Sequence, residues 1–332
     1  TAASSMFNST FKGCTNLEGY IPKNLFAGLI ANNSPSPSMM NNIFNGDTNL
    51  DENCDAYTGM EEYTTGYEDY WSSKVSCRLA PYTVTYSCGD GSGTVASGSA
   101  TYNESFTPAA ANSCTAPNGQ TFVGWAVSGD GSIKTAGTGF TWNYTSGQTL
   151  TAQYKAFSIT TTAIGASPDN TFTFTMTAKG TFYVDCGEGG VLSSSANDVT
   201  GNNIIGRADT TEVTYTCTYP AAGTTARTIW FGGKATQYNV GTGDNSKAPI
   251  SFEGNTKVVT VSGNISAVFP AYSYNNGYYP RFVKSFKDCT NLETIDGSMF
   301  SGYTNGVNYM FYSTFSGCTS LQSIPATLFE NI

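Results

Sequence analysis

The sequence predicts a mainly β chain, in which repeat segments at both termini flank two small β-modules. Two observations lead to this fold class. One motif recurs at both ends of the chain, and two central stretches alternate apolar with polar residues, which is the period of a half-buried strand. The composition fits a folded protein, because 14% of the residues are aromatic and supply apolar surface to bury, although only 12% are charged.

The repeated motif is Phe-x-(Gly/Asp)-Cys-Thr-(Asn/Ser)-Leu, which begins at Phe11, Phe286 and Phe315 and has a degenerate copy at 43–50. Phe286 and Phe315 are 29 residues apart, and counting from Phe315 past the last residue to Phe11 gives (332 − 315) + 11 = 28. The period therefore continues from the end of the chain to its beginning. We expect a processed or excised chain, cut within a repeat array, whose two ends fit each other.

The N-terminal part divides into a repeat segment and a connector. Residues 1–50 carry two repeats, and residues 51–80 are acidic and rich in tyrosine. We expect the connector to form a short helix that a disulfide between Cys54 and Cys77 staples. Its carboxylates fit a solvated face better than a calcium site, since the spacing of an EF-hand is missing.

The first β-module is expected at 81–155. Tyr82, Val84 and Tyr86 alternate with threonines there, as in a half-buried strand. Glycine-containing turns separate this stretch from later apolar segments. We expect Trp125 to anchor the core of this module rather than to serve as a platform for a ligand.

The second β-module is expected at 156–256, with a cleaner alternation. Phe172, Phe174 and Met176 are expected on one face, and the threonines at 171, 173, 175 and 177 on the other. The stretch 213–219 repeats this pattern. Several short strands separated by Gly, Pro and Asn, without a helical period, predict a β-sandwich.

The apolar period changes again at Lys257, where the C-terminal repeats of residues 257–332 begin. Apolar residues after Lys257 match those of the following repeat: Val258 with Leu292, Val261 with Ile295 and Phe269 with Phe300. We expect the first repeat to grow out of the edge of the sandwich. The sandwich would then cap the repeat array, which needs protection at its ends.

Nine cysteines suit an oxidising compartment. Three of them occupy the same position of the repeat, where we expect buried, inert thiols: Cys14, Cys289 and Cys318. The other six allow 15 connectivities, among which we expect neighbour pairing: Cys54 with Cys77, Cys88 with Cys114, and Cys186 with Cys217. Free thiols in a reducing cell are the alternative.

Three families resemble parts of this chain. The motif has apolar residues where a leucine-rich repeat needs them to point inward, and it resembles the BspA-type leucine-rich repeat of bacterial surface proteins. Module 81–155 is similar to the Listeria–Bacteroides (internalin B-repeat) module, in its Tyr-x-Val-x-Tyr strand, the Phe-x-Gly-Trp ending at Trp125 and the Leu-x-Ala-x-Tyr ending at Tyr154. Module 156–256 resembles a PKD-like bacterial sandwich, whose Val-Asp-Trp-Gly-Asp-Gly reads Val-Asp-Cys-Gly-Glu-Gly at 184–189.

The resemblances imply an extracellular protein of the bacterial cell surface, with a role in adhesion or surface structure. They imply neither a particular ligand nor a reaction. Cys186 stands where the PKD-like pattern has Trp, and a bond with Cys217 would explain the cysteine within that strand.

Catalysis is not expected. The chain has no His, which excludes His-based triads and His-ligated metals, and it lacks the GxSxG, P-loop and dinucleotide-binding motifs. We therefore expect no catalytic residue, no cofactor and no metal. A net charge of −9 without a cluster of Lys and Arg argues against nucleic acid, and no apolar run is long enough for membrane insertion.

Two functions from different classes remain, and both use the terminal repeats. In the first, the protein is its own partner: the C-terminal repeats of one copy stack on the N-terminal repeats of the next, which builds an open filament. In the second, it is part of a surface adhesin that binds a host or matrix surface. Closure within one chain is a third possibility. The residues expected at the joint are Phe7, Phe11, Leu17, Ile21 and Phe26 on one side, and Phe315, Leu321, Ile324, Phe329 and Ile332 on the other.

Overall fold

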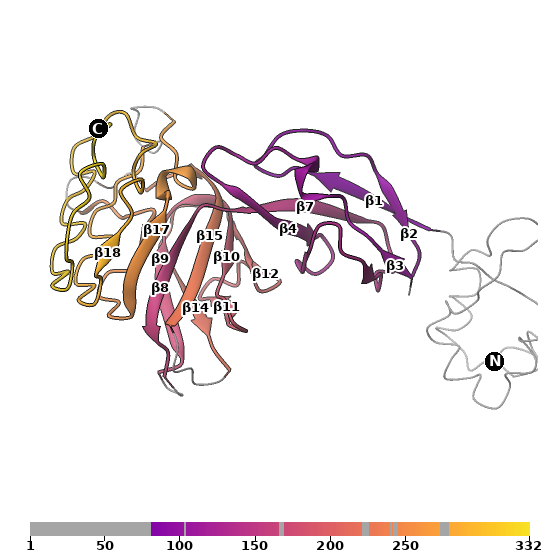
Figure 1. Cartoon of the computed structure of the whole chain (residues 1–332), viewed down its shortest axis with the longest axis horizontal. Helices are drawn as coiled ribbons and strands as arrows, with labels where there is room; N and C mark the ends of the chain where they lie inside the picture. The colour runs from indigo at the N-terminus through magenta and orange to yellow at the C-terminus, as the bar shows by residue number, and fades with distance from the viewer. Residues whose placement is uncertain are drawn as a thin grey trace, which may run out of the picture. The chain divides into compact units, whose positions relative to one another are not determined.

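The computed structural model describes residues 81–332, apart from 103, 166–168, 221–225, 240, 242–244 and 273–278. This part of the chain is mainly β and contains no α-helix, as the sequence predicts (Figure 1). Two short 3-10 helices lie wholly within the described residues, η1 (Ala111–Ser113) and η3 (Ile265–Ala267). The repeats expected at 1–50 and the connector expected at 51–80 lie outside the described residues.

The chain divides into two compact units, and the described residues of the first lie in 81–84, 97–106 and 139–148. In this unit β1 pairs antiparallel with β2, and β3 with β6. Trp142 is fully buried, with its ring centroid 5.2 Å from that of Phe106. The strands before residue 156 are β1 (Tyr82–Ser87), β2 (Gly98–Ala100), β3 (Ser105–Phe106), β4 (Thr121–Val127), β5 (Ile133–Lys134), β6 (Phe140–Thr141) and β7 (Gln148–Lys155).

The second unit begins with a small antiparallel sheet, in which β4 pairs with both β5 and β7. Its core is built on Trp125, which is fully buried. The rings of Tyr86 and Phe122 meet the Trp125 ring edge to face, at 4.9 and 5.3 Å between centroids. The indole N–H of Trp125 donates to the carbonyl of Ala109 at 2.8 Å, so its polar atom is also satisfied. Trp125 is therefore a core residue.

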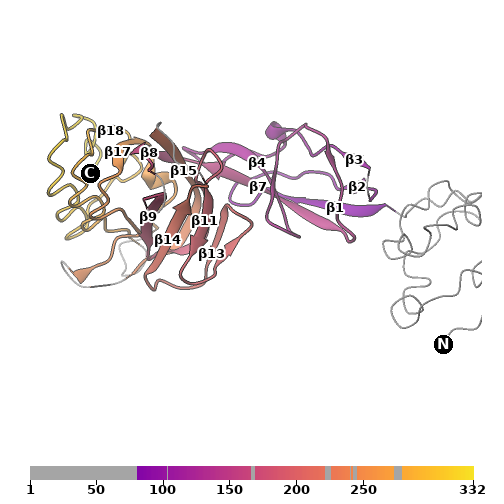
Figure 2. The ribbon, with the colours of Figure 1, turned by 90° about the horizontal axis from the view of Figure 1, so that it is seen from below.

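Two sheets share the largest core of the second unit (Figure 2). One has the strand order β12-β13-β10-β15-β8-β17-β18 and the other β11-β14-β9-β16. We call the region 156–251 the two-sheet body. The strands after residue 155 are β8 (Phe157–Ala163), β9 (Thr171–Met176), β10 (Lys179–Asp185), β11 (Val191–Ser194), β12 (Val199–Thr200), β13 (Ile204–Arg207), β14 (Val213–Thr218), β15 (Ala226–Gln237), β16 (Ile250–Ser251), β17 (Val258–Gly263) and β18 (Thr294–Ile295).

The alternation expected in β9 holds over the length of that strand. Phe172, Phe174 and Met176 are buried, and Phe174 meets Phe231 of the facing sheet at 5.2 Å between centroids. The expectation fails at Thr177, which is buried instead of solvent-facing. β9 ends at Met176, so Thr177 no longer follows the alternation, and its hydroxyl donates to a backbone carbonyl at 2.7 Å.

Two disulfides lie in the second unit. One joins Cys88 to Cys114, and the other joins Cys186, which directly follows β10, to Cys217 of β14. The second disulfide therefore links the two sheets of the body. Both are pairs that neighbour pairing predicts, while the expected pair of Cys54 and Cys77 lies outside the described residues. The two bonds suit an extracellular type of protein.

After the two-sheet body, three chain segments lie one on another, and we call them the C-terminal stack. The first segment is 252–272, the second 282–303 and the third 310–332. β17 of the first segment pairs antiparallel with β8 of the body and parallel with β18 of the second segment. The sheet thus runs from the body into the stack. The N–H of Ile265 in the first segment donates to the carbonyl of Met299 in the second at 3.0 Å, which joins these two segments at a second place.

A partly buried carboxylate also holds the first and second segments together. Asp296 accepts hydrogen bonds from the N–H of Gly263 at 3.0 Å and from the N–H and hydroxyl of Ser298, both at 2.8 Å. Burial raises the pKa of Asp296, but these hydrogen bonds outweigh it and hold the pKa below the ordinary value.

Candidate functional site

Two columns of aromatic rings run through the C-terminal stack. Phe252, Phe286 and Phe315 lie one above the other, with centroids 5.1 and 5.6 Å apart and rings inclined by 23° and 17°. In the other column Phe300 stacks on Phe329 at 5.8 Å and 13°. Each segment of the stack therefore covers the rings of the segment before it, and the rings of the third segment end both columns.

Side-chain hydrogen bonds repeat from segment to segment in the same way. The hydroxyl of Thr314 donates to the carbonyl of Phe282 at 2.8 Å. The thiol of Cys289 donates to the carbonyl of Phe252 at 3.1 Å, and the thiol of Cys318 to that of Phe286 at 3.0 Å. Each of these side chains thus satisfies a backbone acceptor of the preceding segment.

The two thiols differ in burial. Cys289 is fully buried, and burial together with the neighbouring Cys318 raises its pKa to about 12. Cys318 is only half-buried, which corrects the expectation of a buried thiol at this position, because nothing among the described residues covers the third segment. Burial also raises the pKa of Cys318, so both thiols stay protonated at neutral pH and act as donors.

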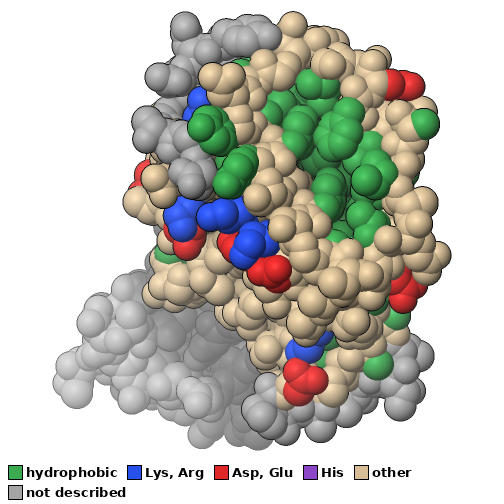
Figure 3. Space-filling model, turned by 90° about the vertical axis from the view of Figure 1, so that its left-hand side faces the viewer, with side chains coloured by type: hydrophobic (Ala, Val, Ile, Leu, Met, Phe, Trp, Pro, Cys, Tyr) green, Lys and Arg blue, Asp and Glu red, His purple; other side chains and the backbone are tan. Residues whose placement is uncertain are grey.

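The outer face of the third segment is apolar and open. Ile324 is 67% exposed, and Phe329 and Ile332 are each 40% exposed. Figure 3 looks at the C-terminal stack and shows hydrophobic side chains gathered into one patch there. We call this patch the end face. Patches of this kind mark interaction sites in soluble proteins.

The end face includes every joint residue that the sequence predicts near the C-terminus. Phe315 and Leu321 are partly buried against the core, and Ile324, Phe329 and Ile332 are exposed. The opposite half of the expected joint lies outside the described residues: Phe7, Phe11, Leu17, Ile21 and Phe26. The repeat thiol Cys14 lies outside them as well.

Sequence reasoning missed three aromatic residues of the third segment. Phe311 is partly buried and its ring lies 4.9 Å from that of Phe329. Tyr309 and Tyr312 are 49% and 44% exposed, and their rings meet at 5.7 Å. Phe311 could have been found from its match with Phe7, which the same reasoning included. No repeat pattern singles out the two tyrosines.

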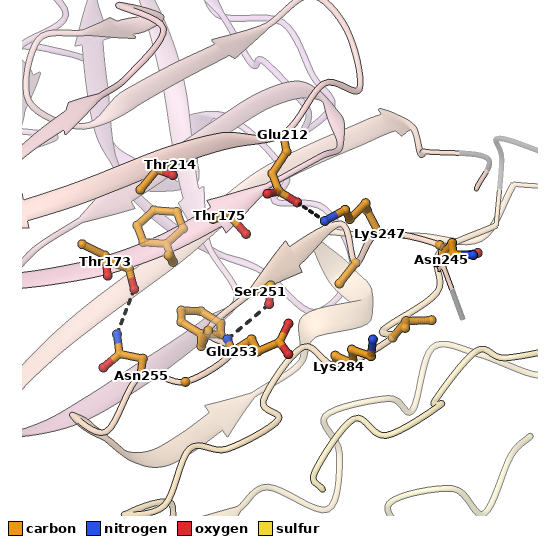
Figure 4. A pocket seen from close by; sticks show the side chains of 16 residues that line it. Thr173, Thr175, Glu212, Thr214, Asn245, Lys247, Ser251, Glu253, Asn255 and Lys284 are labelled. Atoms are coloured by element: carbon orange, nitrogen blue, oxygen red, sulfur yellow. Dashed lines mark hydrogen bonds and ion pairs between the residues drawn. The ribbon is translucent and has the colours of Figure 1, made fainter. Parts of the chain in front are cut away.

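A solvent-open cavity of about 540 Å³ lies between the two-sheet body and the C-terminal stack (Figure 4). Threonines of β9 and β14 form one wall. Glu212 and Lys247 form an ion pair of 3.1 Å at its side, and the amide of Asn255 donates to the carbonyl of Thr173 at 2.8 Å. The lining can hydrogen-bond a polar molecule.

The described residues contain neither a cluster of metal ligands nor a helix that could span a membrane. They contain no group of three or more His, Cys, Asp or Glu side chains that could hold a metal ion. No helix among them is long and apolar enough to cross a membrane.

Comparison of the chain with protein-family models, with curated proteins and with solved structures finds no match.

Proposed function

We propose that this chain is a non-enzymatic structural protein of the bacterial cell surface, and that it assembles head to tail into a filament. In this proposal the C-terminal stack is part of a leucine-rich-repeat solenoid of the BspA type. The N-terminal repeats of the next copy continue it. The small β-module and the two-sheet body, as B-repeat-like and PKD-like modules, separate successive joints.

The end face is the observation that carries the proposal. Phe286 inside the stack has a ring on each side, whereas Phe315 has, among the described residues, a ring on its inner side only. An apolar side chain such as Ile324 gains about 25 cal/mol for each Å² that a partner removes from water. Among the described residues no polar cap covers the bare aromatic and aliphatic side chains of the third segment, and repeat arrays need protection at such a face.

The N-terminal repeats supply a matching occupant. They carry at Phe11 the same motif that the stack's own segments carry at Phe286 and Phe315. A contact between one end and the opposite end of another copy is heterologous, and such contacts propagate into a filament unless they close. The disulfides of the second unit agree with an extracellular setting for this assembly.

The test is the size of the purified chain at micromolar concentration, by light scattering and negative-stain microscopy. Wild-type protein is expected to form linear oligomers. Ile324→Asp is expected to give protomers, because the side chain is 67% exposed in the free chain but would place a charge in a dry joint. Val191→Asp is the matched control, since Val191 is 46% exposed on β11, away from the end face, and should leave assembly unchanged.

A monodisperse wild-type monomer at micromolar concentration would refute the proposal and favour an adhesin whose end face meets a host or matrix surface. Equal loss of assembly in Ile324→Asp and Val191→Asp would refute the end face as the joint.

A further inference from the structure

The end face also carries an edge of backbone donors. In the second segment the N–H groups of four residues donate to carbonyls of the third: Phe282 to Met310 at 2.6 Å, Lys284 to Tyr312 at 3.0 Å, Phe286 to Thr314 at 2.9 Å and Asp288 to Ser316 at 2.7 Å. The first segment does the same, since Phe252 donates to the carbonyl of Ser285 at 2.6 Å. At this side of the stack, backbone N–H groups of one segment therefore donate forward to carbonyls of the next, whereas Glu293, Asp296 and Gln322 donate backward at another side.

Among the described residues, the same four positions in the third segment have no acceptor. With the 29-residue offset they are Phe311, Ser313, Phe315 and Gly317, and within the described residues their N–H groups make no hydrogen bond. The N–H groups between them are satisfied, because Tyr312, Thr314 and Ser316 each donate three residues back. As in the second segment, alternate N–H groups of the third segment donate within the segment. The N–H groups between them are the ones that would donate to a following segment, and among the described residues these have no acceptor. A row of unpaired N–H groups is a template for another chain segment.

Two carbonyls of the third segment are also ready for a further segment. The carbonyl of Phe282 accepts from the N–H of Ser285 and from the hydroxyl of Thr314. Within the part of the chain that the structure describes, the carbonyl of Phe311, its counterpart, accepts only from the N–H of Thr314. The carbonyl of Phe315 likewise accepts there only from the N–H of Cys318. Each keeps one lone pair for a side-chain donor of the next segment.

Residues 6–17 have the sequence that this edge requires. Aligned with 310–321, they differ at three of twelve positions, so nine are identical. The second segment, which already pairs with the third, matches it at only five of the corresponding twelve positions, 281–292. Gly13 matches Gly317, which has a φ of +79° that favours glycine. The occupant is thus a closer copy of the third segment than the neighbour already in place.

We propose that the edge pairs with residues 6–17 of a second copy, in the register that the second and third segments use. This rests on the proposed filament and specifies its joint. The N–H groups of Phe311, Ser313, Phe315 and Gly317 donate to the carbonyls of Met6, Asn8, Thr10 and Lys12. The hydroxyl of Thr10 donates to the carbonyl of Phe311, and the thiol of Cys14 to that of Phe315. Phe11 extends the aromatic column over Phe315. Phe7 stacks on Phe311 as Phe311 stacks on Phe282, with centroids 6.1 Å apart and rings inclined by 7°.

The register can be tested by disulfide trapping between two populations of full-length chain that carry tags of different length. One population has Ser316→Cys, and the other has Lys12→Cys. The proposed register puts these positions in adjacent segments, about 5 Å apart between Cα atoms, which suits a disulfide. Asn8→Cys replaces Lys12→Cys in the control, because Asn8 would lie against Tyr312 instead. Because each chain carries only one engineered cysteine, a mixed disulfide joins two copies by construction.

The expected result is at least about tenfold more mixed disulfide with Lys12→Cys than with Asn8→Cys after mild oxidation, mapped by peptide mass. Ser316→Cys mixed with wild-type chain gives the background from native thiols. Filaments that trap Asn8→Cys as well as Lys12→Cys, or neither, would overturn the register and leave the proposed function standing. Chains that neither assemble nor trap would overturn both.

Discussion

Truncation of one ring inside the stack and of one ring at its end should separate the stability of a protomer from the stability of the joint. Phe286→Ala removes a fully buried ring that has Phe252 on one side and Phe315 on the other. A buried Phe→Ala change costs about 3–5 kcal/mol of unfolding free energy. Phe315→Ala removes a ring that is covered on one side, so about half of that, roughly 2 kcal/mol, is expected in a protomer.

The remaining half, roughly 2 kcal/mol, should appear as weaker assembly. That difference corresponds to about a thirtyfold increase in the dissociation constant of the joint. The protomer values are measured by urea unfolding in an Ile324→Asp background, which keeps the chains apart. The dissociation constant is measured by dilution of Phe315→Ala without that background.

Two outcomes would contradict this reasoning. If Phe315→Ala costs as much as Phe286→Ala in the protomer, the end face is already covered within one chain. If Phe315→Ala leaves the dissociation constant unchanged, the column of rings does not continue across the joint.

Three further predictions concern the second unit. Replacing Cys186 and Cys217 together by Ser should cost about 3–4 kcal/mol of unfolding free energy on the chain-entropy model for a separation of 31 residues, measured by urea unfolding. Because the pKa of Asp296 is lowered in the folded state, this carboxylate stabilises the fold fully above its unfolded pKa of about 3.9, and the stabilisation is lost as the pH falls through the folded pKa. Asp296→Asn should therefore reduce the decrease in unfolding free energy between about pH 5 and pH 3. In a protomer, Cys318 should react with a thiol reagent long before the buried Cys289, whose pKa burial raises to about 12. Assembly into filaments should protect Cys318 from the reagent as well. Equal labelling rates of Cys318 in protomers and filaments would count against the joint.

The fold class was accessible from the sequence because a period of two is a direct consequence of burying one face of a strand. Phe172, Phe174 and Met176 follow it without exception. The prediction fails at Thr177, where the pattern outlasts the strand itself. Local composition does not show where this strand ends, because Met176, its last residue, and Thr177, the next residue, both continue the alternating pattern.

The candidate site was only partly accessible, because exposure depends on what lies over a residue. Leu328 and Phe329 are adjacent apolar residues of the same repeat, yet Leu328 is buried and Phe329 is 40% exposed. The motif gives both the same weight. The unpaired N–H groups could not be predicted from the sequence either. Every residue except proline has a backbone N–H, and the acceptors of the equivalent groups in the second segment lie 28 residues further along the chain.

The placement of β17 between β8 and β18 has a consequence for the order of folding. The second segment can pair with β17 only after β17 has paired with β8 of the body. The C-terminal stack is therefore expected to fold outward from the body, one segment at a time. Neighbouring units of such a stack stabilise each other and little else. On the proposed joint, residues 6–17 of an arriving copy would take the next place in that sequence of events. Polymerisation would then be the folding reaction of one chain, continued with the residues of another.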